Sequence, residues 1–159
     1  MTRVLVAGVG NLLRADDGFG PAVAARLDGL PADARVVETG IGGIALVQEL
    51  MAHPYDGLVV VDAVDRGETP GTVFVLEPEV GAAAHVPDVH LANPERVLAM
   101  AQGLGVLPGR VRIVGCQPAE ADALEQGLSP AVERAVATAV ARVDELVQAW
   151  LAEGDSAHV

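Results

Sequence analysis

The chain has 159 residues, of which 51% are hydrophobic and 3% aromatic, and it carries a formal net charge of −12 with no lysine. This length suits a single domain over residues 1–159, and a core of Val, Leu, Ile and Ala suits a buried parallel sheet covered by helices. The acidic balance argues against a nucleic acid or an anionic membrane surface as the main partner and favours a basic protein or a cationic metal.

Cysteine usage and hydropathy predict a soluble cytoplasmic protein with no membrane partner. Cys116 is the only cysteine, so no intramolecular disulfide can form and a reducing compartment is expected. Residues 1–3 lead directly into a strand-like run, without the charged and long apolar regions of a signal peptide. No segment approaches the ~18 consecutive apolar residues that a membrane span needs.

The first half of the chain alternates short buried strands with amphipathic helices. Residues 4–9 and 58–61 are apolar runs of strand length, and residues 35–38 supply a short strand between them. Residues 21–27 and 44–51 carry apolar side chains at helical spacing. This alternation predicts right-handed crossovers in a largely parallel sheet.

The second half predicts an edge strand, two helices and one more buried strand. Residues 72–76 follow the turn signal Pro70-Gly71 at short range, which suits an antiparallel edge strand. Residues 96–102 are expected to form a helix and residues 111–114 a buried strand. Ser129-Pro130 offers a cap and a first-turn proline for a final helix, which Gly154 is expected to end.

Polar residues follow several of the predicted strands, where an open parallel sheet collects its ligands. Asp17 lies in the loop after the first strand, Asp62 ends the third, and His90 lies after the edge strand, just before a helix. Two carboxylates and an imidazole can hold nickel, zinc or manganese and leave coordination positions open for a substrate. Acidic residues at strand ends are also common as solvated loop residues, so the spacing alone leaves both interpretations open.

Other chemistries are poorly supported by the sequence. Gly8-Val9-Gly10 follows a strand as in a dinucleotide-binding loop, but Leu13 stands where the third glycine belongs, and no Walker lysine exists. Cys116 has no histidine after it until His158 and is expected to be a buried thiol. A Gly-x-Ser-x-Gly elbow and a zinc-protease His-Glu-x-x-His helix are both missing.

An ordered set of motifs resembles the hydrogenase maturation endopeptidases over nearly the whole chain. The set consists of Gly8-Val9-Gly10-Asn11, Asp16-Asp17-Gly18-Phe19-Gly20, Val61-Asp62-Ala63, Gly67 with Pro70-Gly71-Thr72, His90 with Val97-Leu98, and Gly127-Leu128-Ser129-Pro130. The resemblance implies a three-layer α/β/α sandwich with a five-stranded, mostly parallel sheet that has one antiparallel strand. It also implies a metal site at the carboxyl end of that sheet.

Carried over residue by residue, the resemblance implies that the metal ligands are Asp17, Asp62 and His90. Asp16 would support them, for example by accepting amide hydrogen bonds from loops, although it also suits a plain acid at a helix start. Gly10, Asn11, Gly40 and Gly43 would line the substrate site. Gln117 stands before Pro118 where many relatives carry glutamate.

The implied function is endopeptidase activity at a site of aspartates and metal. The enzyme would remove the C-terminal extension of a nickel-loaded hydrogenase large-subunit precursor, with the substrate's own nickel as a recognition tether; another divalent metal could bind in vitro. The alternative from another class is a non-catalytic metal-binding or chaperone-like maturation factor, and a nucleotide-binding Rossmann-type protein is a third. The resemblance leaves the attacking nucleophile unassigned.

Overall fold

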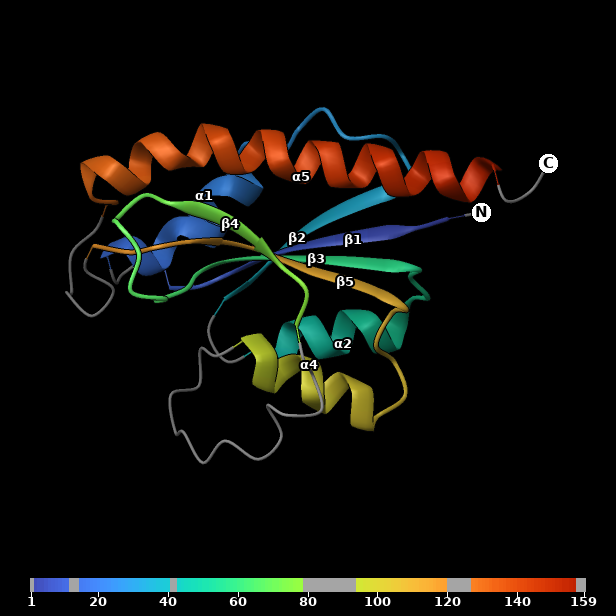
Figure 1. The fold of residues 1–159 in the computed structure, drawn as a ribbon. Helices are drawn as coiled ribbons and strands as arrows, with labels where there is room; N and C mark the ends of the chain where they lie inside the picture. The colour runs from blue at the N-terminus through green and yellow to red at the C-terminus, as the bar shows by residue number, and fades with distance from the viewer. Residues whose placement is uncertain (1, 12–14, 41–42, 79–93, 120–126, 157–159) are drawn as a thin grey trace.

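The computed structural model describes residues 2–11, 15–40, 43–78, 94–119 and 127–156 (Figure 1). Five strands form one sheet in the order β2-β1-β3-β5-β4; β4 is antiparallel to β5 and the other neighbours are parallel. The strands are β1 (Val4–Val9), β2 (Ala34–Gly40), β3 (Gly57–Ala63), β4 (Val73–Leu76) and β5 (Arg110–Cys116). The helices are the short 3-10 helix η1 (Ala15–Gly18) and α1 (Phe19–Ala25), α2 (Ile44–Ala52), α4 (Pro94–Gly103) and α5 (Pro130–Ser156).

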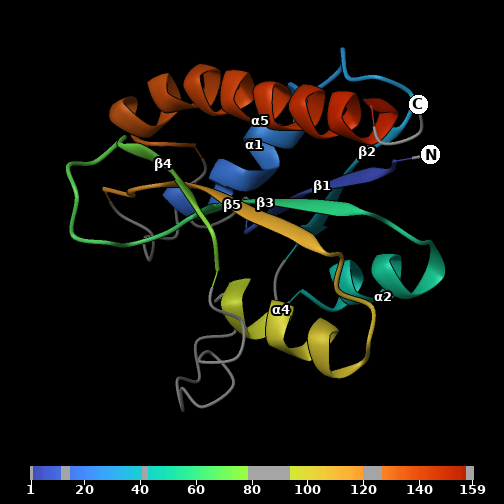
Figure 2. The same cartoon turned by 45° about the vertical axis from the view of Figure 1, so that its right-hand side comes forward.

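The helices cover both faces of the sheet and make a three-layer α/β/α sandwich. In Figures 1 and 2, α1 and α5 lie on one face, and α2 and α4 lie on the other. Each face has its own apolar core: Phe19, Val136 and Val143 belong to the first, and Leu46 and Leu98 to the second. The predicted α/β fold, with four parallel strands and one antiparallel strand, is confirmed.

Several predicted elements begin or end at other residues than in the structure, and the first and last helices show this most clearly. The first helix begins at Phe19, two residues before the predicted start, and ends at Ala25, two residues before the predicted end. After Ala25 the Arg26 N–H donates to the Val23 carbonyl, which forms a tighter turn. The prediction that Gly154 ends the last helix is wrong, because α5 continues to Ser156. A single glycine costs a helix only about 1 kcal/mol, which the packing of this long helix against the sheet can offset.

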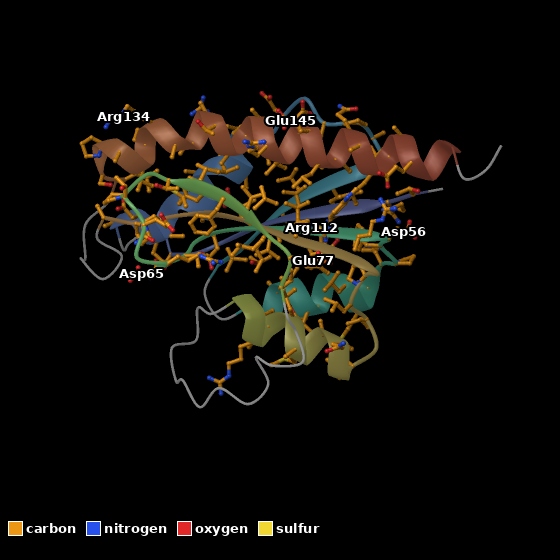
Figure 3. The ribbon with its side chains drawn as sticks, in the orientation of Figure 1. Asp56, Asp65, Glu77, Arg112, Arg134 and Glu145 are labelled. Atoms are coloured by element: carbon orange, nitrogen blue, oxygen red, sulfur yellow. The ribbon has the colours of Figure 1, made fainter. Side chains whose placement is uncertain are left out.

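The parallel register brings the carboxyl ends of the strands to one edge of the sheet. Gly8 pairs with Val61 across β1 and β3, and Asp62 pairs with Gly115 across β3 and β5. Figure 3 labels Asp65, just beyond β3, at this carboxyl edge and Asp56, just before β3, at the opposite edge. The loops that follow β1, β2, β3 and β5 therefore share the carboxyl edge.

Helix α1 packs directly on the sheet because two glycines meet there. A Cβ atom at Gly8 would lie 2.5 Å from the carbonyl oxygen of Gly20, and a Cβ at Gly20 would lie 2.7 Å from the nitrogen of Val9. Any side chain at either position would push the helix away. This close packing positions η1, which immediately precedes α1, over the carboxyl ends of β1 and β3.

Candidate active site

Asp62 is a buried carboxylate without a hydrogen-bond partner in the described part of the chain. It is the sixth residue of β3, its exposed fraction is 1%, and neither carboxylate oxygen has such a partner. Burial raises the pKa of Asp62 well above its usual value, and the nearby charge of Asp17 adds to the rise. The Ala63 amide opposes the rise, but its geometry falls short of a hydrogen bond. A charged carboxylate in this buried position is unfavourable unless it binds a cation or takes up a proton.

Asp17 is held at the same edge by the loop after β1. Its Oδ2 accepts a hydrogen bond from the Asn11 N–H at 3.0 Å, and its backbone carbonyl accepts from the same N–H at 3.1 Å. Since the charge of Asp17 also raises the pKa of Asp62, the two predicted metal ligands are electrostatic neighbours. The third predicted ligand, His90, lies outside the described residues.

Of the predicted substrate-binding residues, Gly10 and Asn11 contact the backbone or side chain of Asp17, and Gly40 contacts Gly10. The Gly10 N–H donates to the Gly40 carbonyl at 3.3 Å, which ties the loop after β1 to the end of β2. Gly10 has a φ of 147° and lies against Asp17, where a Cβ would overlap the Asp17 carbonyl. Gly43 precedes α2 and packs against Val97 of α4. Substrate contact by Gly10, Asn11, Gly40 and Gly43 stays a prediction.

Asp16 anchors the segment that carries Asp17. Its fully buried carboxylate accepts hydrogen bonds from the Ala119 N–H (2.8 Å), the Ser129 N–H (2.7 Å) and the Ser129 hydroxyl (2.9 Å). Ala15, directly before it, has a φ of 40°, a left-handed conformation that costs a non-glycine residue about 1–2 kcal/mol. The Asp16 hydrogen bonds therefore join η1 to the segment before α5 and help to hold a strained turn.

Gln117 organises the loop after β3, a role that the sequence analysis missed. Its side-chain oxygen accepts from the N–H groups of Arg66 (2.7 Å) and Glu68 (3.1 Å), and its Nε2 donates to the Asp65 carboxylate at 2.9 Å. This bond and the Gly67 N–H lower the pKa of Asp65. A glutamate at position 117 could not donate in this way while ionised. The available signal was a polar residue directly after a buried strand.

Cys116 is a buried thiol, as predicted. Burial, together with the charge of Asp16, raises its pKa to about 11, although the Gly71 backbone opposes the rise. At neutral pH the sulfur is therefore protonated and a poor nucleophile.

Asp17 and Asp62 alone can supply only part of the ligands that a bound cation needs. Among the described residues, no group of three His, Cys, Asp or Glu side chains could hold a metal ion. Asp17 and Asp62 offer carboxylate oxygens at the carboxyl edge, and both buried oxygens of Asp62 lack a hydrogen-bond partner in the described part of the chain.

Two surface hollows lie away from this edge. Glu77 and Arg112 line the first, where their side chains form an ion pair at 3.7 Å, and Asp56 and Trp150 line the second. Figure 3 shows Glu77, Arg112 and Asp56 well away from Asp65. Neither hollow contains a predicted site residue. In addition, none of the helices in the described ranges has the length and hydropathy to cross a bilayer.

The fold is similar to that of solved endopeptidases that mature hydrogenases. The hydrogenase-maturating endopeptidase HybD from E. coli has a TM-score of 0.79 and 26% identity, with 92% of this chain and 93% of that chain covered. The hydrogenase 2 maturation peptidase from a Thaumarchaeota archaeon has a TM-score of 0.70 and 35% identity, with 92% and 99% covered.

Sequence comparison assigns the family. The family model described as hydrogenase maturation protease matches residues 22–145. The hydrogenase expression/formation protein HupD of Rhodobacter capsulatus is 36% identical over 154 residues, which cover 93% of this chain and 72% of that protein. The chain belongs to the hydrogenase maturation protease family, which confirms the resemblance seen in the motifs and supports an endopeptidase role in hydrogenase maturation.

Proposed function

We propose that this protein removes the C-terminal extension of a nickel-loaded hydrogenase large-subunit precursor, and that the nickel of the substrate docks against Asp17, Asp62 and His90. Membership of the protease family supports the reaction class. The observation that carries the metal tether is Asp62, whose carboxylate is buried at the carboxyl edge with no hydrogen-bond partner among the described residues. A cation delivered by the substrate would stabilise that charge.

The proposed role of the tether is to position the scissile bond. Nickel bound to the substrate's own thiolates would gain Asp17 and Asp62 as further ligands, which holds the neighbouring peptide bond in one place. The Asn11 N–H pre-orients the Asp17 carboxylate for this contact. Because the two carboxylates would already be held in place, binding of the ion would need little further ordering of the enzyme.

We infer that water is the attacking group. Cys116 is buried and protonated, and the Ser129 hydroxyl donates to Asp16. Water would add to the carbonyl carbon, the C–N bond would break, and the proton of the water would pass to the leaving amine. The metal or an aspartate would activate the water, and the products would be a new carboxylate and a free tail.

The test is mass spectrometry of the nickel-loaded precursor before and after incubation with the enzyme. The wild type is expected to release the tail, and Asp62→Asn, Asp17→Asn and His90→Ala are each expected to lower the rate by about 100-fold or more, because each removes a metal ligand. A matched carboxylate-to-amide control is Glu145→Gln on the exposed side of α5 (Figure 3), where its ion pair with Arg142 is solvent-exposed.

The outcomes separate the proposal from its alternatives. Full cleavage by the ligand variants would exclude the proposed tether, while leaving the endopeptidase role intact. Binding of the precursor by the wild type without any change in its mass would instead favour a non-catalytic maturation factor.

A further inference from the structure

Strand β2 forms an open edge of the sheet. It is the first strand in the order β2-β1-β3-β5-β4, and β1 is its only neighbour among the described strands. An edge strand presents unpaired backbone N–H and C=O groups that can pair with another extended chain. The side chains of Arg35 and Glu38 are exposed along it.

The register shows which backbone groups of β2 face outward. The Val4 N–H donates to the Asp33 carbonyl at 3.0 Å, and the Gly10 N–H donates to the Gly40 carbonyl at 3.3 Å. With the alternation of a parallel ladder, the backbone groups of Arg35 and Val37 face β1, and those of Val36 and Glu38 face away from it. On that outer side neither Val36 nor Glu38 makes a backbone hydrogen bond to any other described residue.

The open edge leads directly into the candidate active site. The ladder between β1 and β2 shifts register after Glu38, so that Val9 pairs with Gly40 and Thr39 is the extra residue. Thr39 is 6% exposed, and its hydroxyl has no hydrogen-bond partner in the described structure. One residue further on, Gly40 is exposed, a Cβ there would meet nothing within 4 Å, and its carbonyl accepts from Gly10 beside Asp17. Open space beside Gly40 therefore lies where the edge meets the site.

From this geometry we infer that the tail of the precursor binds as an added strand along β2, antiparallel to it. The inference rests on the proposed function, because the tail is the segment beyond the scissile bond. A tail that leaves the carboxyl edge and follows β2 must run toward the start of β2, which makes the pairing antiparallel. The N–H and C=O groups of Val36 and Glu38 would bond the tail backbone, and main-chain bonds of this kind give affinity without a strict sequence.

A second copy of the chain is the competing occupant of this edge. Each copy carries a net charge of −12, so self-association would bring two strongly acidic molecules together. The bulge at Thr39 and the exposed charges of Arg35 and Glu38 are also features that protect natural edge strands from pairing with each other.

The experiment combines Glu38→Pro with a precursor whose tail is cut short just beyond the scissile bond. Proline at position 38 removes an N–H that faces outward and leaves the β1 ladder intact, a placement that edge strands tolerate. For the full-length tail we expect KM to rise about 5- to 10-fold in Glu38→Pro with little change in kcat, because one hydrogen bond made equally in the ground and transition states is lost. For the short tail, wild type and variant are expected to have the same KM.

A second measurement does not depend on the folding of the variant. A synthetic tail peptide is used as a competitive inhibitor of the wild type, beside the same peptide N-methylated at alternate amides. Methylation of the amides that face β2 is expected to raise the inhibition constant at least 5-fold, and methylation of the other set is expected to have little effect.

Several results would overturn the inference. Equal KM of Glu38→Pro and wild type for the full tail, or equal inhibition by both methylated peptides, would exclude strand addition while wild-type cleavage still upholds the proposed function. A wild-type dimer that Glu38→Pro converts to a monomer would assign the edge to a second copy. Absence of wild-type cleavage would remove the proposed function and the inference together.

Discussion

Asp62, a proposed metal ligand, lowers the stability of the metal-free protein when it is charged, since it is an acid buried without a hydrogen-bond partner among the described residues. Its pKa in the folded protein is well above the value of about 3.9 expected in the unfolded chain. The folded state therefore binds a proton more tightly than the unfolded state does. The contribution of Asp62 to the free energy of unfolding therefore falls as pH rises from about 4 to the pKa of the folded protein. Above that pKa the contribution no longer changes with pH.

This linkage predicts the effect of Asp62→Asn on metal-free protein. At neutral pH the variant is expected to be at least as stable as the wild type, because the amide carries no charge to bury. As pH falls toward 4 the wild type gains stability relative to the variant, because Asp62 takes up a proton. Urea denaturation of both proteins between pH 4 and pH 8 measures this difference, and a difference independent of pH would contradict the assignment.

Asp16 is also buried, but unlike Asp62 its carboxylate accepts three hydrogen bonds. Asp16→Asn is expected to cost about 3 kcal/mol in the free energy of unfolding, since the amide NH₂ group would face a donor and leave a buried N–H unpaired. Ser129→Ala removes the hydroxyl and keeps the two backbone donors, so about 1 kcal/mol is expected for it. Denaturant titration of both variants checks the ranking. Equal losses would show that the backbone bonds to Asp16 contribute little.

At the scale of elements, the contact of α1 with the sheet decides where η1 and Asp17 lie. Gly20→Ala would place a Cβ against the backbone of Val9 and Val61, where nothing flexible can give way. We expect a loss of at least about 3 kcal/mol in stability and a strong loss of cleavage, because the helix must move off the strand ends.

The matched control is Gly29→Ala, in the connection between α1 and β2. A Cβ at Gly29 would meet nothing within 4 Å, and the residue does not need a left-handed φ. Its stability is expected to stay within about 0.5 kcal/mol of the wild type. Thermal denaturation and the precursor assay compare the two variants directly. A Gly20→Ala protein that is as active as Gly29→Ala would show that Asp17 does not depend on this packing.

The whole molecule is strongly acidic, and the proposed mechanism needs metal only from the substrate. We therefore expect enzyme treated with a chelator and then dialysed to hold less than one metal ion per chain and still to cleave nickel-loaded precursor at the untreated rate. The physical reason is that the proposed site would offer oxygen and imidazole ligands without thiolates and would leave coordination positions open. Elemental analysis beside the cleavage assay measures both quantities. Stoichiometric metal that resists the chelator would contradict the substrate-borne tether.

Much of this fold could be predicted because its central strands, β1 and β3, are buried on both faces. The runs at β1 and β3 are continuous apolar segments of strand length, and the turn at Pro70-Gly71 correctly indicated an antiparallel strand after it. The exact ends of the helices were less certain. Phe19 and Gly20 look like loop residues locally, but the packing of α1 on β1 and β3 draws them into the helix, and tertiary contacts of this kind override local propensity.

The site was predictable only in outline. Asp17 and Asp62 could be expected to meet because both follow strands that end at the same edge. The partners of Asp16 could not, because Ala119 and Ser129 lie 103 and 113 residues away and two of the three hydrogen bonds come from backbone N–H groups, which every sequence contains. The same holds for Gln117, whose partners lie around 50 residues away in the loop after β3.

The sequence by itself determined the class of fold, the ordered motifs of the family and the acids placed at strand ends, because periodicity and residue type are local properties. Only the tertiary structure decided that Asp62 lacks a hydrogen-bond partner among the described residues while Asp16 has several, and that β2 offers a free edge beside Gly40. Burial, hydrogen bonding and strand order depend on which distant segments meet, and no local pattern encodes them.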